Sequence, residues 1–286
     1  MIILLPQTDI DYQLVDSGNG FRLERFGQYI LVRPDPQTIW KPKLSEQVWQ
    51  KFDAKHGLPG RWIKRSKIPD KWVLRYRNIS LYCKLTPFKH TGVFPEQTAH
   101  WEWLSNIILN AAVSTKKEIN ILNLFGYTGG ATLAAAATGA KVTHVDASHP
   151  AISWARENQQ LSGLEQKNIR WILDDAVKFC QREIKRGVKY DGIIMDPPIY
   201  GHGPKGEKWH FNISFPNLVD LCSQLLSDNP LFVIVNAYAI SSSSEMLKNV
   251  LADYLPKGQI ESGELSLKDQ SDRLLSTGIF ARWTPR

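Results

Sequence analysis

The sequence predicts an α/β protein with a doubly wound, mostly parallel sheet that has an antiparallel edge, and with a small strand-rich module at the N-terminus. Three observations favour this fold. A short apolar run leads through a glycine-rich turn and an alanine-rich helix into a second strand that ends in an acid. Two further apolar runs downstream also end in acids. The first 88 residues instead alternate polar and apolar side chains between glycines and prolines, as short strands and turns do.

The first apolar run, residues 121–125, is typical of a buried parallel strand. The turn after it contains three glycines, which let the backbone turn sharply and approach a ligand closely. These glycines are Gly126, Gly129 and Gly130.

An alanine-rich helix over residues 131–137 follows the turn, and Gly139 is its predicted C-terminal cap. Residues 142–145 predict the second strand, with Asp146 at its carboxyl end. Strand, glycine turn, helix, strand and acid together are typical of an adenosine-cofactor site, in which the acid accepts from the two ribose hydroxyls. A dinucleotide site usually has G-x-G-x-x-G, whereas this turn has G-x-x-G-G, so a nicotinamide oxidoreductase fits poorly.

The next two strands add acids at their carboxyl ends. Residues 169–173 predict a strand that ends in Asp174-Asp175-Ala176, and residues 192–195 predict one that ends in Asp196-Pro197-Pro198. The carboxyl ends of neighbouring parallel strands line the ligand crevice in such folds, so these residues are expected to share one site.

With these residues in order, the chain resembles the class I S-adenosylmethionine-dependent methyltransferases, which have a Rossmann-like sheet. More narrowly, it resembles the bacterial large-subunit ribosomal RNA methyltransferase group, over about the last two-thirds of the chain. The matching residues are Asn123-Leu124-Phe125-Gly126-Tyr127-Thr128-Gly129-Gly130, Val145-Asp146-Ala147-Ser148, Asp174-Asp175-Ala176, Asp196-Pro197-Pro198 and, upstream, Lys89-His90-Thr91-Gly92-Val93-Phe94-Pro95-Glu96-Gln97.

The resemblance implies S-adenosylmethionine as cofactor and a residue-level map of its site. The glycine turn would hold the methionine part, Asp146 the ribose and Asp175 the adenine amino group, and the Asp196 turn would face the methyl group. The cofactor-binding residues implied are Phe94, Gln97, Phe125, Gly126, Thr128, Gly129, Gly130, Asp146, Ala147, Asp175, Ala176 and Asp196.

The chemistry expected at the transfer site is alignment, because the cofactor is already activated. Asp196 and the Pro197 carbonyl can each accept a hydrogen bond from an N–H of the target, and Tyr200 could stack on a splayed-out base. The other reading of Tyr200 is a packing aromatic. Residues 201–210 contain three glycines and predict a lid or substrate loop in which Lys205 and Trp209 reach RNA, with a plain surface turn as the alternative.

The sequence departs from members of that group that methylate carbon 5 of cytosine through a cysteine nucleophile. In those proteins, the cysteine follows the strand after Asp-Pro-Pro, where this chain has Asn236-Ala237-Tyr238. Cys83, Cys180 and Cys222 lie elsewhere and show neither metal-ligand nor disulfide spacing. Direct transfer to a nitrogen is therefore expected, with an oxygen as the second choice and no metal.

The charge is concentrated in one segment. The chain of 286 residues carries a net charge of +7, yet residues 41–90 hold thirteen basic and three acidic residues, which leaves −3 for the remainder. Tryptophans and tyrosines are interleaved with these cations, a pattern that suits a phosphate backbone with unpaired bases. Lys64, Arg65 and Lys67 are the candidate RNA contacts there. The alternative is a solvated charged face over a small core.

The organisation predicted is a β-rich basic module over residues 1–88, for RNA or substrate recognition, and an S-adenosylmethionine-binding methyltransferase domain over residues 89–286. Apolar residues make up 43% of the chain, enough for a sizeable core, and no run is long enough to span a membrane. The N-terminal residues lack the features of a secretory signal, so a cytoplasmic enzyme is expected.

The function that the sequence favours is methylation of a base nitrogen in RNA, with ribosomal RNA as the first choice. A methyltransferase acting on a protein or small molecule is one alternative. Another is a non-catalytic RNA-binding factor that holds the cofactor, although a factor without turnover would be free to lose the three strand-end acids Asp146, Asp175 and Asp196.

Overall fold

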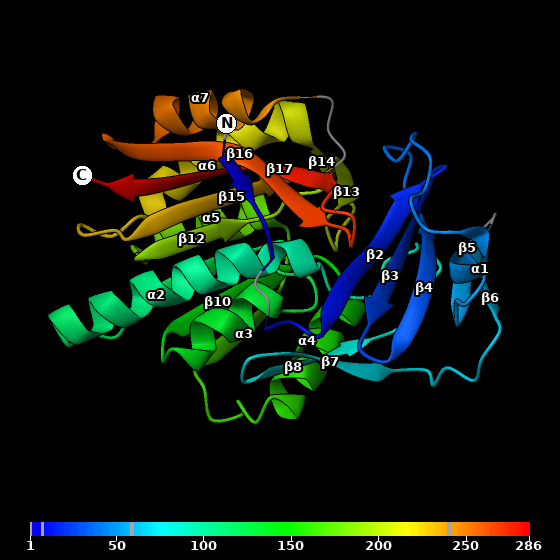
Figure 1. The fold of residues 1–286 in the computed structure, drawn as a ribbon. Coiled ribbons are helices and arrows are strands. Elements are labelled where there is room, and N and C mark those ends of the chain that lie inside the picture. The colour runs from blue at the N-terminus through cyan, green and yellow to red at the C-terminus, as the bar shows by residue number, and fades with distance from the viewer. Residues whose placement is uncertain (1, 7–8, 58–59, 239–241) are drawn as a thin grey trace. The chain divides into compact units, whose positions relative to one another are not determined.

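The computed structural model of the protein describes residues 2–6, 9–57, 60–238 and 242–286. The chain runs through β1 (Ile2–Leu4), β2 (Tyr12–Gly18), β3 (Phe21–Phe26), β4 (Tyr29–Pro34), α1 (Glu46–Trp49), β5 (Ala54–Gly57), β6 (Arg61–Lys64), β7 (Trp72–Tyr76), β8 (Ile79–Cys83), the 3₁₀ turn η1 (Pro95–Gln97), α2 (Thr98–Thr115), β9 (Asn120–Leu124), α3 (Gly130–Ala137), β10 (Lys141–Asp146), α4 (His149–Leu161), β11 (Ile169–Leu173), α5 (Ala176–Lys185), β12 (Gly192–Met195), β13 (Tyr200–His202), β14 (Lys208–His210), α6 (Phe211–Leu225), β15 (Phe232–Ala237), α7 (Ser244–Tyr254), β16 (Gly258–Lys268) and β17 (Leu274–Pro285) (Figure 1).

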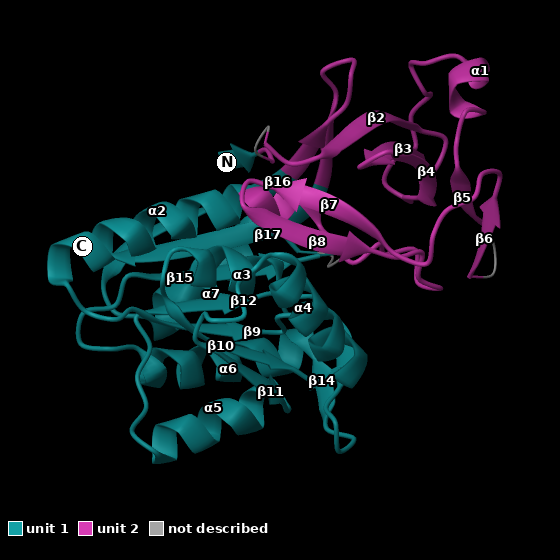
Figure 2. Ribbon diagram, turned by 90° about the horizontal axis from the view of Figure 1, so that it is seen from below, with its two compact units in different colours: residues 1–4, 99–265, 277–286 teal, residues 5–98, 266–276 magenta. Residues whose placement is uncertain are grey.

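Two compact units share the chain (Figure 2). Unit 1 contains residues 1–4, 99–265 and 277–286, and unit 2 contains residues 5–98 and 266–276. Both units are therefore discontinuous in sequence. The division into domains of residues 1–88 and 89–286, which the sequence suggests, stays a prediction.

Unit 1 is built on one eight-stranded sheet with the order β1-β16-β17-β15-β12-β9-β10-β11. The five strands from β15 to β11 run parallel, and β17 pairs antiparallel with β15. The mostly parallel sheet with an antiparallel part, predicted from the apolar runs, is confirmed. Strand β1 was not predicted, and it extends the edge by pairing in parallel with β16.

The helices of unit 1 cover both faces of this sheet. Side chains of α5, α6 and α7 pack with Leu124, Met195 and Val235 in one buried cluster. Helices α2, α3 and α4 lie on the opposite face (Figure 1). Strands covered on both faces are mostly apolar, which is why the runs at β9, β12 and β15 could be recognised from sequence. Among the described residues, no helix combines the length and apolarity needed to cross a membrane.

Unit 2 contains a five-stranded sheet of order β2-β3-β4-β5-β6 and the separate hairpin β7-β8. Neighbouring strands of the five-stranded sheet are antiparallel except for β4 and β5, which are parallel. The segment of chain that connects β4 to β5 contains α1. The strand-rich module predicted for the first 88 residues is thus confirmed in its secondary structure. The residues between β16 and β17 also belong to this unit.

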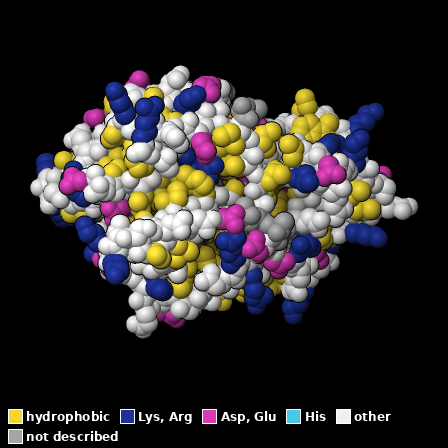
Figure 3. Space-filling view, turned by 60° about the vertical axis from the view of Figure 1, so that its left-hand side comes forward, with side chains coloured by type: hydrophobic (Ala, Val, Ile, Leu, Met, Phe, Trp, Pro, Cys, Tyr) yellow, Lys and Arg dark blue, Asp and Glu magenta, His cyan; other side chains and the backbone are white. Residues whose placement is uncertain are grey.

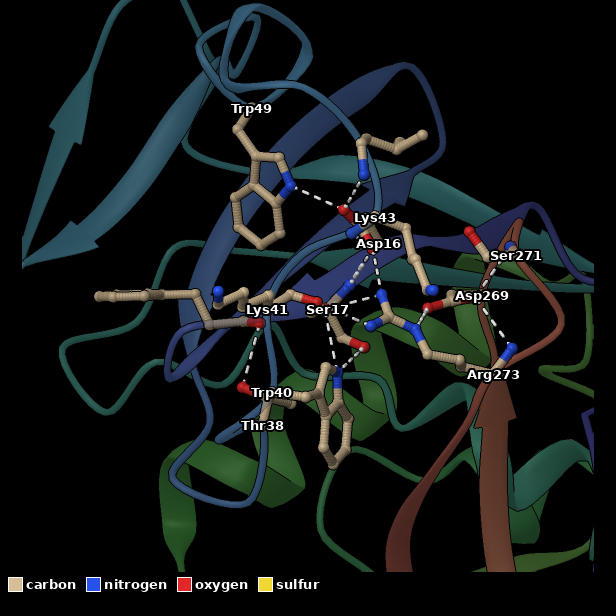
Figure 4. Close-up of polar contacts among 12 residues, drawn as sticks. Asp16, Ser17, Thr38, Trp40, Lys41, Lys43, Trp49, Asp269, Ser271 and Arg273 are labelled. Atoms are coloured by element: carbon tan, nitrogen blue, oxygen red, sulfur yellow. Dashed lines mark hydrogen bonds and ion pairs between the residues drawn. The ribbon is translucent and has the colours of Figure 1, made fainter.

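A single carboxylate, that of Asp16, ties together three distant segments of unit 2 (Figure 4). Asp16 Oδ2 accepts from the backbone N–H of Leu44 and from the Trp49 indole, each at 2.8 Å. Asp16 Oδ1 accepts from Arg273 Nη2 at 2.6 Å, and Arg273 also pairs with Asp269 at 3.0 Å. The β16–β17 connection is therefore fixed to β2 by charge-assisted hydrogen bonds.

A second buried ionic cluster centres on Glu24 in β3. Arg33 donates to both Glu24 oxygens at 2.7 Å, and the Tyr12 hydroxyl donates to Oε1 at 2.8 Å. Arg22 lies 3.7 Å from Glu24 and pairs with Asp35 at 3.1 Å. Burial alone would raise the pKa of Glu24, but Arg33 and Arg22 hold that pKa at about 2.

Replacing Glu24 by glutamine is expected to lower the free energy of unfolding by about 3–5 kcal/mol at pH 7, because Arg33 would remain buried without its carboxylate. Glu24 stabilises the fold above the pKa of the unfolded chain, and this stabilisation is lost as pH falls towards 2. Urea unfolding at pH 7 and pH 3 should show the difference between variant and parent shrinking at the lower pH. The exposed pair Lys268–Asp272 supplies the control, Asp272→Asn, which is expected to change little. A constant difference at both pH values would contradict the ionic role of Glu24.

Candidate functional site

The carboxyl ends of four neighbouring strands in unit 1 carry the acids and glycines that the sequence singled out. In the order β12-β9-β10-β11, these ends lead into Asp196, the turn 125–130, Asp146 and Asp174-Asp175. The parallel pairing brings them to one edge of the sheet, as expected for a ligand crevice.

The turn between β9 and α3 is held in an unusual backbone conformation. Phe125, Tyr127 and Gly129 have φ values of 57°, 49° and 88°. For the two aromatic residues, this left-handed region costs energy that the surroundings must offset. The N–H of Gly126 donates to the Val145 carbonyl at 3.1 Å, which fixes the turn against β10. Gly129 is the N-cap of α3, so the turn feeds directly into the helix.

Two of the glycines are required by packing inside the protein. A Cβ on Gly126 would overlap the imidazole of His144, and a Cβ on Gly130 would overlap the Trp101 indole. The sequence suggested ligand approach as the reason for these glycines, and the structure adds close contact with buried rings below the turn. No spacing in the sequence pointed to His144 or Trp101.

His144 belongs to a buried polar chain beneath the turn. Asn123 donates to Thr132 Oγ1 at 2.8 Å, and that oxygen lies 2.9 Å from His144 Nδ1. Burial lowers the pKa of His144 to about 3, so the imidazole is neutral at neutral pH. The ring packs against Trp171 with centroids 4.6 Å apart. These side chains come from β9, β10, β11 and α3, and they support the glycine turn from inside the protein.

Asp146 makes two backbone hydrogen bonds at the end of β10. Its Oδ2 accepts from Tyr127 N–H and its Oδ1 from Ser148 N–H, each at 2.8 Å. Burial raises the pKa of this carboxyl, and the backbone N–H groups of Ser148, Tyr127 and Ala147 oppose that shift. Asp146 thus braces the glycine turn through Tyr127. Ala147 lies half-buried beside it.

Asp175 and Ala176 begin α5 after β11. Asp175 is the N-cap, and its Oδ1 accepts from Lys178 N–H at 2.9 Å, while Ala176 is buried. Asp174 forms an ion pair with Arg182 and accepts from the N–H of Asp175 at 2.9 Å. Of the two acids, Asp174 is thus held by a cation, and Asp175 caps the helix.

The segment after Asp196-Pro197-Pro198 is a hairpin of β13 and β14, where the sequence predicted a loop. Tyr200 is 67% exposed, with its ring edge against His210 at 4.6 Å between centroids. Lys205 is exposed at the tip. Trp209 is buried, its Nε1 donates to the Pro198 carbonyl at 2.6 Å, and its ring lies 5.0 Å from that of Phe125.

Two of the predicted cofactor residues lie in unit 2. Phe94 precedes η1, with its ring 5.4 Å from that of His90, and Gln97 ends η1 and donates its N–H to the Phe94 carbonyl at 3.1 Å. Their approach to the glycine turn stays a prediction.

The three predicted RNA contacts in unit 2 differ from one another. Lys64, Arg65 and Lys67 are all exposed. Arg65 donates to the carbonyl and the side-chain oxygen of Gln50, at 2.6 and 2.9 Å, and covers the Phe52 ring at 4.1 Å. Among the described residues, the ammonium groups of Lys64 and Lys67 have no such partner.

All three cysteines are free thiols, and all three are buried. Cys83 lies in β8, Cys180 in α5 and Cys222 in α6, where its sulfur lies 3.7 Å from Met195 Sδ. Burial raises the pKa of Cys83, and contact with Cys180 together with burial raises that of Cys222. These thiols are therefore poor nucleophiles. The described residues hold no group of three or more His, Cys, Asp or Glu placed to bind a metal ion.

Comparison with known proteins agrees with this geometry. A family model described as S-adenosylmethionine-dependent methyltransferase matches residues 69–247. The crystal structure of a SAM-dependent methyltransferase from Agrobacterium tumefaciens is 42% identical, with a TM-score of 0.95, and the match covers 100% of this chain and 94% of that one. The chain belongs to the S-adenosylmethionine-dependent methyltransferase family, and S-adenosylmethionine is its cofactor.

More distant curated relatives have names that specify a substrate. Ribosomal RNA large subunit methyltransferase K of Neisseria meningitidis is 24% identical over 208 residues, covering 66% of this chain and 54% of that protein. Ribosomal RNA large subunit methyltransferase K/L of Shewanella frigidimarina is 32% identical over 251 residues, covering 79% of this chain and 34% of that protein. This chain therefore spans about half of the first relative and a third of the second.

Proposed function

We propose that this enzyme transfers the methyl group of S-adenosylmethionine directly to a base nitrogen in RNA, with ribosomal RNA as the favoured class. The observation that carries the proposal is the Asp196-Pro197-Pro198 turn at the carboxyl end of β12, joined to the glycine turn through the contact between Trp209 and Phe125. The names of the curated relatives support RNA as the substrate.

The residues at the strand ends fit the cofactor. Each Asp146 oxygen accepts one backbone hydrogen bond, and a carboxylate oxygen can accept two, so each oxygen retains a site for a ribose hydroxyl. Asp175 Oδ1 caps α5, and we assign the adenine amino group to Oδ2. Phe125, Gly126, Thr128, Gly129 and Gly130 would hold the methionine part. Phe94 and Gln97 complete this proposed set.

The cofactor supplies an activated methyl group when bound, so this chain's task is alignment of the target. Asp196 would accept a hydrogen bond from an amino or ring N–H of the base, and the Pro197 carbonyl would accept a second. The two bonds would direct the nitrogen lone pair at the methyl carbon. Tyr200 is sufficiently exposed for a splayed-out base to stack on its ring.

The basic segment supports contact with phosphates more than contact with bases. Seven of its thirteen cations are exposed and, within the described residues, have no side-chain partner; these are Lys41, Lys43, Lys51, Arg61, Lys64, Lys67 and Arg75. By contrast, the four interleaved indoles donate inside unit 2, to Ser17, Asp16, Thr86 and Phe26. Free cations and engaged aromatics favour a structured RNA backbone as the partner.

The charge is nevertheless not spread as one continuous surface. On the face shown in Figure 3, Lys and Arg side chains point outwards in several places, with Asp and Glu side chains between them. We therefore assign the proposed phosphate contacts mainly to unit 2, where the sequence concentrates the excess of cations, and the base contacts to the region after Asp196 in unit 1. We further propose that residues 1–88 recognise the RNA and that residues 89–286 carry out methyl transfer. The proposed location of the enzyme is the cytoplasm.

Replacing Lys64 and Lys67 together by alanine is expected to weaken RNA binding and to reduce the slope of log K against log salt by about one per cation removed, because each releases counterions from a phosphate. Binding of structured RNA would be measured across a salt series. The matched control removes two exposed cations of unit 1, Lys116 and Lys117, and should leave the slope unchanged. Equal slopes for parent and Lys64/Lys67 variant would show these cations to be a solvated surface.

The proposed function itself is tested by mass spectrometry of RNA nucleosides from cells with and without this protein. One N-methylated nucleoside should disappear from ribosomal RNA in its absence and return when the gene is restored. Restoration of an Asp196→Ala variant should not return it. An unchanged RNA profile, together with methyl transfer to a protein or small molecule, would replace the RNA assignment with the alternative substrate class.

A further inference from the structure

The hairpin of β13 and β14 depends on contacts outside itself. It follows directly on Asp196-Pro197-Pro198, and only three residue pairs face each other, from Tyr200 opposite His210 to His202 opposite Lys208. A two-stranded hairpin of this length is not stable alone in water. Its position in unit 1 is therefore set by what holds its base and its tip.

The tip is tethered at the surface. Glu207 accepts from Lys178 Nζ at 2.6 Å and from the Lys205 N–H at 2.9 Å. Glu207 is the partner of a cation in the first turn of α5, and this contact holds the pKa of Glu207 at about 2. A surface ion pair of this kind contributes little to stability, so the base of the hairpin must carry most of its positioning.

The base is anchored by Trp209, which is 6% exposed. Its Nε1 donates to the Pro198 carbonyl at 2.6 Å, and its ring packs against Phe125 with centroids 5.0 Å apart. One side chain therefore touches both the turn after β12 and the turn after β9. The next residue pair, Phe211 N–H to the Ile199 carbonyl at 2.9 Å, continues the attachment.

The Asp-Pro-Pro turn needs a donor from elsewhere. Pro197 and Pro198 have no backbone N–H, so the turn cannot be fixed by donors of its own at these positions. The Trp209 indole supplies a donor at Pro198, the residue next to the proposed Pro197 acceptor. Loss of this N–H would remove one support of the turn while leaving the strands of the sheet intact.

We infer that Trp209 is a positioning residue for methyl transfer, whose indole fixes the Asp196-Pro197-Pro198 turn at a set separation from Phe125 in the cofactor turn. This inference rests on the proposed function, because it takes Asp196 and Pro197 to align the target. The sequence suggested direct contact with RNA as the role of Trp209. We infer instead that the buried Trp209 side chain supports the Asp196-Pro197-Pro198 turn.

The effect of this support should be larger on rate than on folding. A neutral hydrogen bond makes a small net contribution to stability. In contrast, a displacement of about 1 Å at the reacting groups can cost on the order of 10²-fold in rate. Substitution of Trp209 should therefore appear in kcat before it appears in the melting temperature or in cofactor affinity.

The test is Trp209→Phe, which keeps an aromatic ring against Phe125 and removes the N–H donor. The substrate is RNA isolated from cells that lack this protein, and the measurements are kcat, KM for S-adenosylmethionine and the melting temperature. We expect kcat to fall by about tenfold or more, with KM for the cofactor nearly unchanged, since misalignment affects the transition state more than cofactor binding.

Trp283→Phe is the matched control. Trp283 is 1% exposed, and its Nε1 also donates to a proline carbonyl, that of Pro256, at 3.0 Å. The same change of chemistry there is expected to lower the melting temperature by a similar amount and to leave kcat at the parent value. Equal kcat values for the two variants would overturn the positioning role.

Asp196→Ala separates this inference from the proposed function. If Asp196→Ala abolishes transfer and Trp209→Phe retains the parent kcat, the inference about Trp209 is wrong and the proposed transfer site stands. If neither variant changes transfer, the placement of the transfer site at Asp196 is wrong. A selective loss of kcat in both variants supports both assignments.

Discussion

Asp196→Ala is expected to reduce kcat for methyl transfer by about 10²–10³-fold, equivalent to about 3–4 kcal/mol of barrier. Under the proposed function, the Asp196 carboxylate aligns the target nitrogen by accepting a hydrogen bond from its N–H. Affinity for S-adenosylhomocysteine, the demethylated product, should change much less, because most of the other proposed cofactor contacts lie at the ends of β9, β10 and β11. Single-turnover kinetics and calorimetry on the same preparation separate the two effects.

Asp196→Asn sharpens this prediction. The amide keeps the shape and one oxygen acceptor but loses the charge, so its kcat should lie between those of the parent and the alanine variant. An alanine variant with parent activity would place the reacting nitrogen away from Asp196.

The same site predicts that no covalent enzyme–RNA adduct forms. The thiols of Cys83, Cys180 and Cys222 are buried, and none of them directly follows the carboxyl end of β9, β10, β11 or β12. RNA containing 5-fluorocytidine traps enzymes that attack carbon 6 through a thiolate. A stable adduct with this protein, or loss of turnover on changing one cysteine to serine, would contradict direct transfer to nitrogen.

Asp146→Ala is expected to weaken binding of S-adenosylmethionine by two to four orders of magnitude. Two hydrogen bonds from ribose hydroxyls to a carboxylate are worth about 1.5–3 kcal/mol each. The variant also loses the acceptor for Tyr127 N–H, which braces the glycine turn. Isothermal calorimetry with S-adenosylmethionine and its demethylated product measures the loss directly.

The control for Asp146 lies at the opposite end of the sheet. Asp191 accepts from the backbone N–H of Asn120 at 2.8 Å and from the Ser227 hydroxyl at 2.7 Å. Asp191→Ala removes a comparable pair of hydrogen bonds, so it should lower stability without changing cofactor affinity. Similar affinity losses in the two variants would mean that Asp146 acts through stability alone, and unchanged affinity for Asp146→Ala would remove the ribose from that position.

The central strands could be predicted because their burial leaves a mark in the sequence. Strands β9, β12 and β15 are covered on both faces and read as apolar runs. Strand β1 has only three residues and forms by pairing with the distant β16, so its local sequence pattern does not predict a strand.

Residues of the candidate site could be predicted where the signal lies in their immediate neighbours in the sequence. Asp146 and the glycine turn could be predicted because each directly follows an apolar run that is typical of a strand. Trp209 could not be predicted in this way, because its partners, Pro198 and Phe125, become neighbours only through the sheet order. A glycine-rich stretch reads as a free loop, and only tertiary contacts turn residues 201–210 into an anchored hairpin.

The same holds for the basic segment. The sequence counts Lys64 and Arg65 as equivalent charges, but Arg65 is engaged by Gln50 and Phe52. Likewise, interleaved tryptophans suggest stacking platforms until their indole N–H groups are traced to partners within unit 2. Composition reveals an excess of cations, and only contacts separate the cations already in use from those that remain for a partner.

The ion pair between Asp16 and Arg273 determines which stretches of sequence must be kept together for unit 2 to fold. Arg273 lies 257 residues after Asp16 in the sequence, yet its guanidinium neutralises that buried carboxylate. A fragment that stops at residue 88 would leave Asp16 desolvated without its cation, a costly state. Recombination between related genes is therefore expected to preserve unit 2 only when residues 266–276 are inherited together with residues 5–98.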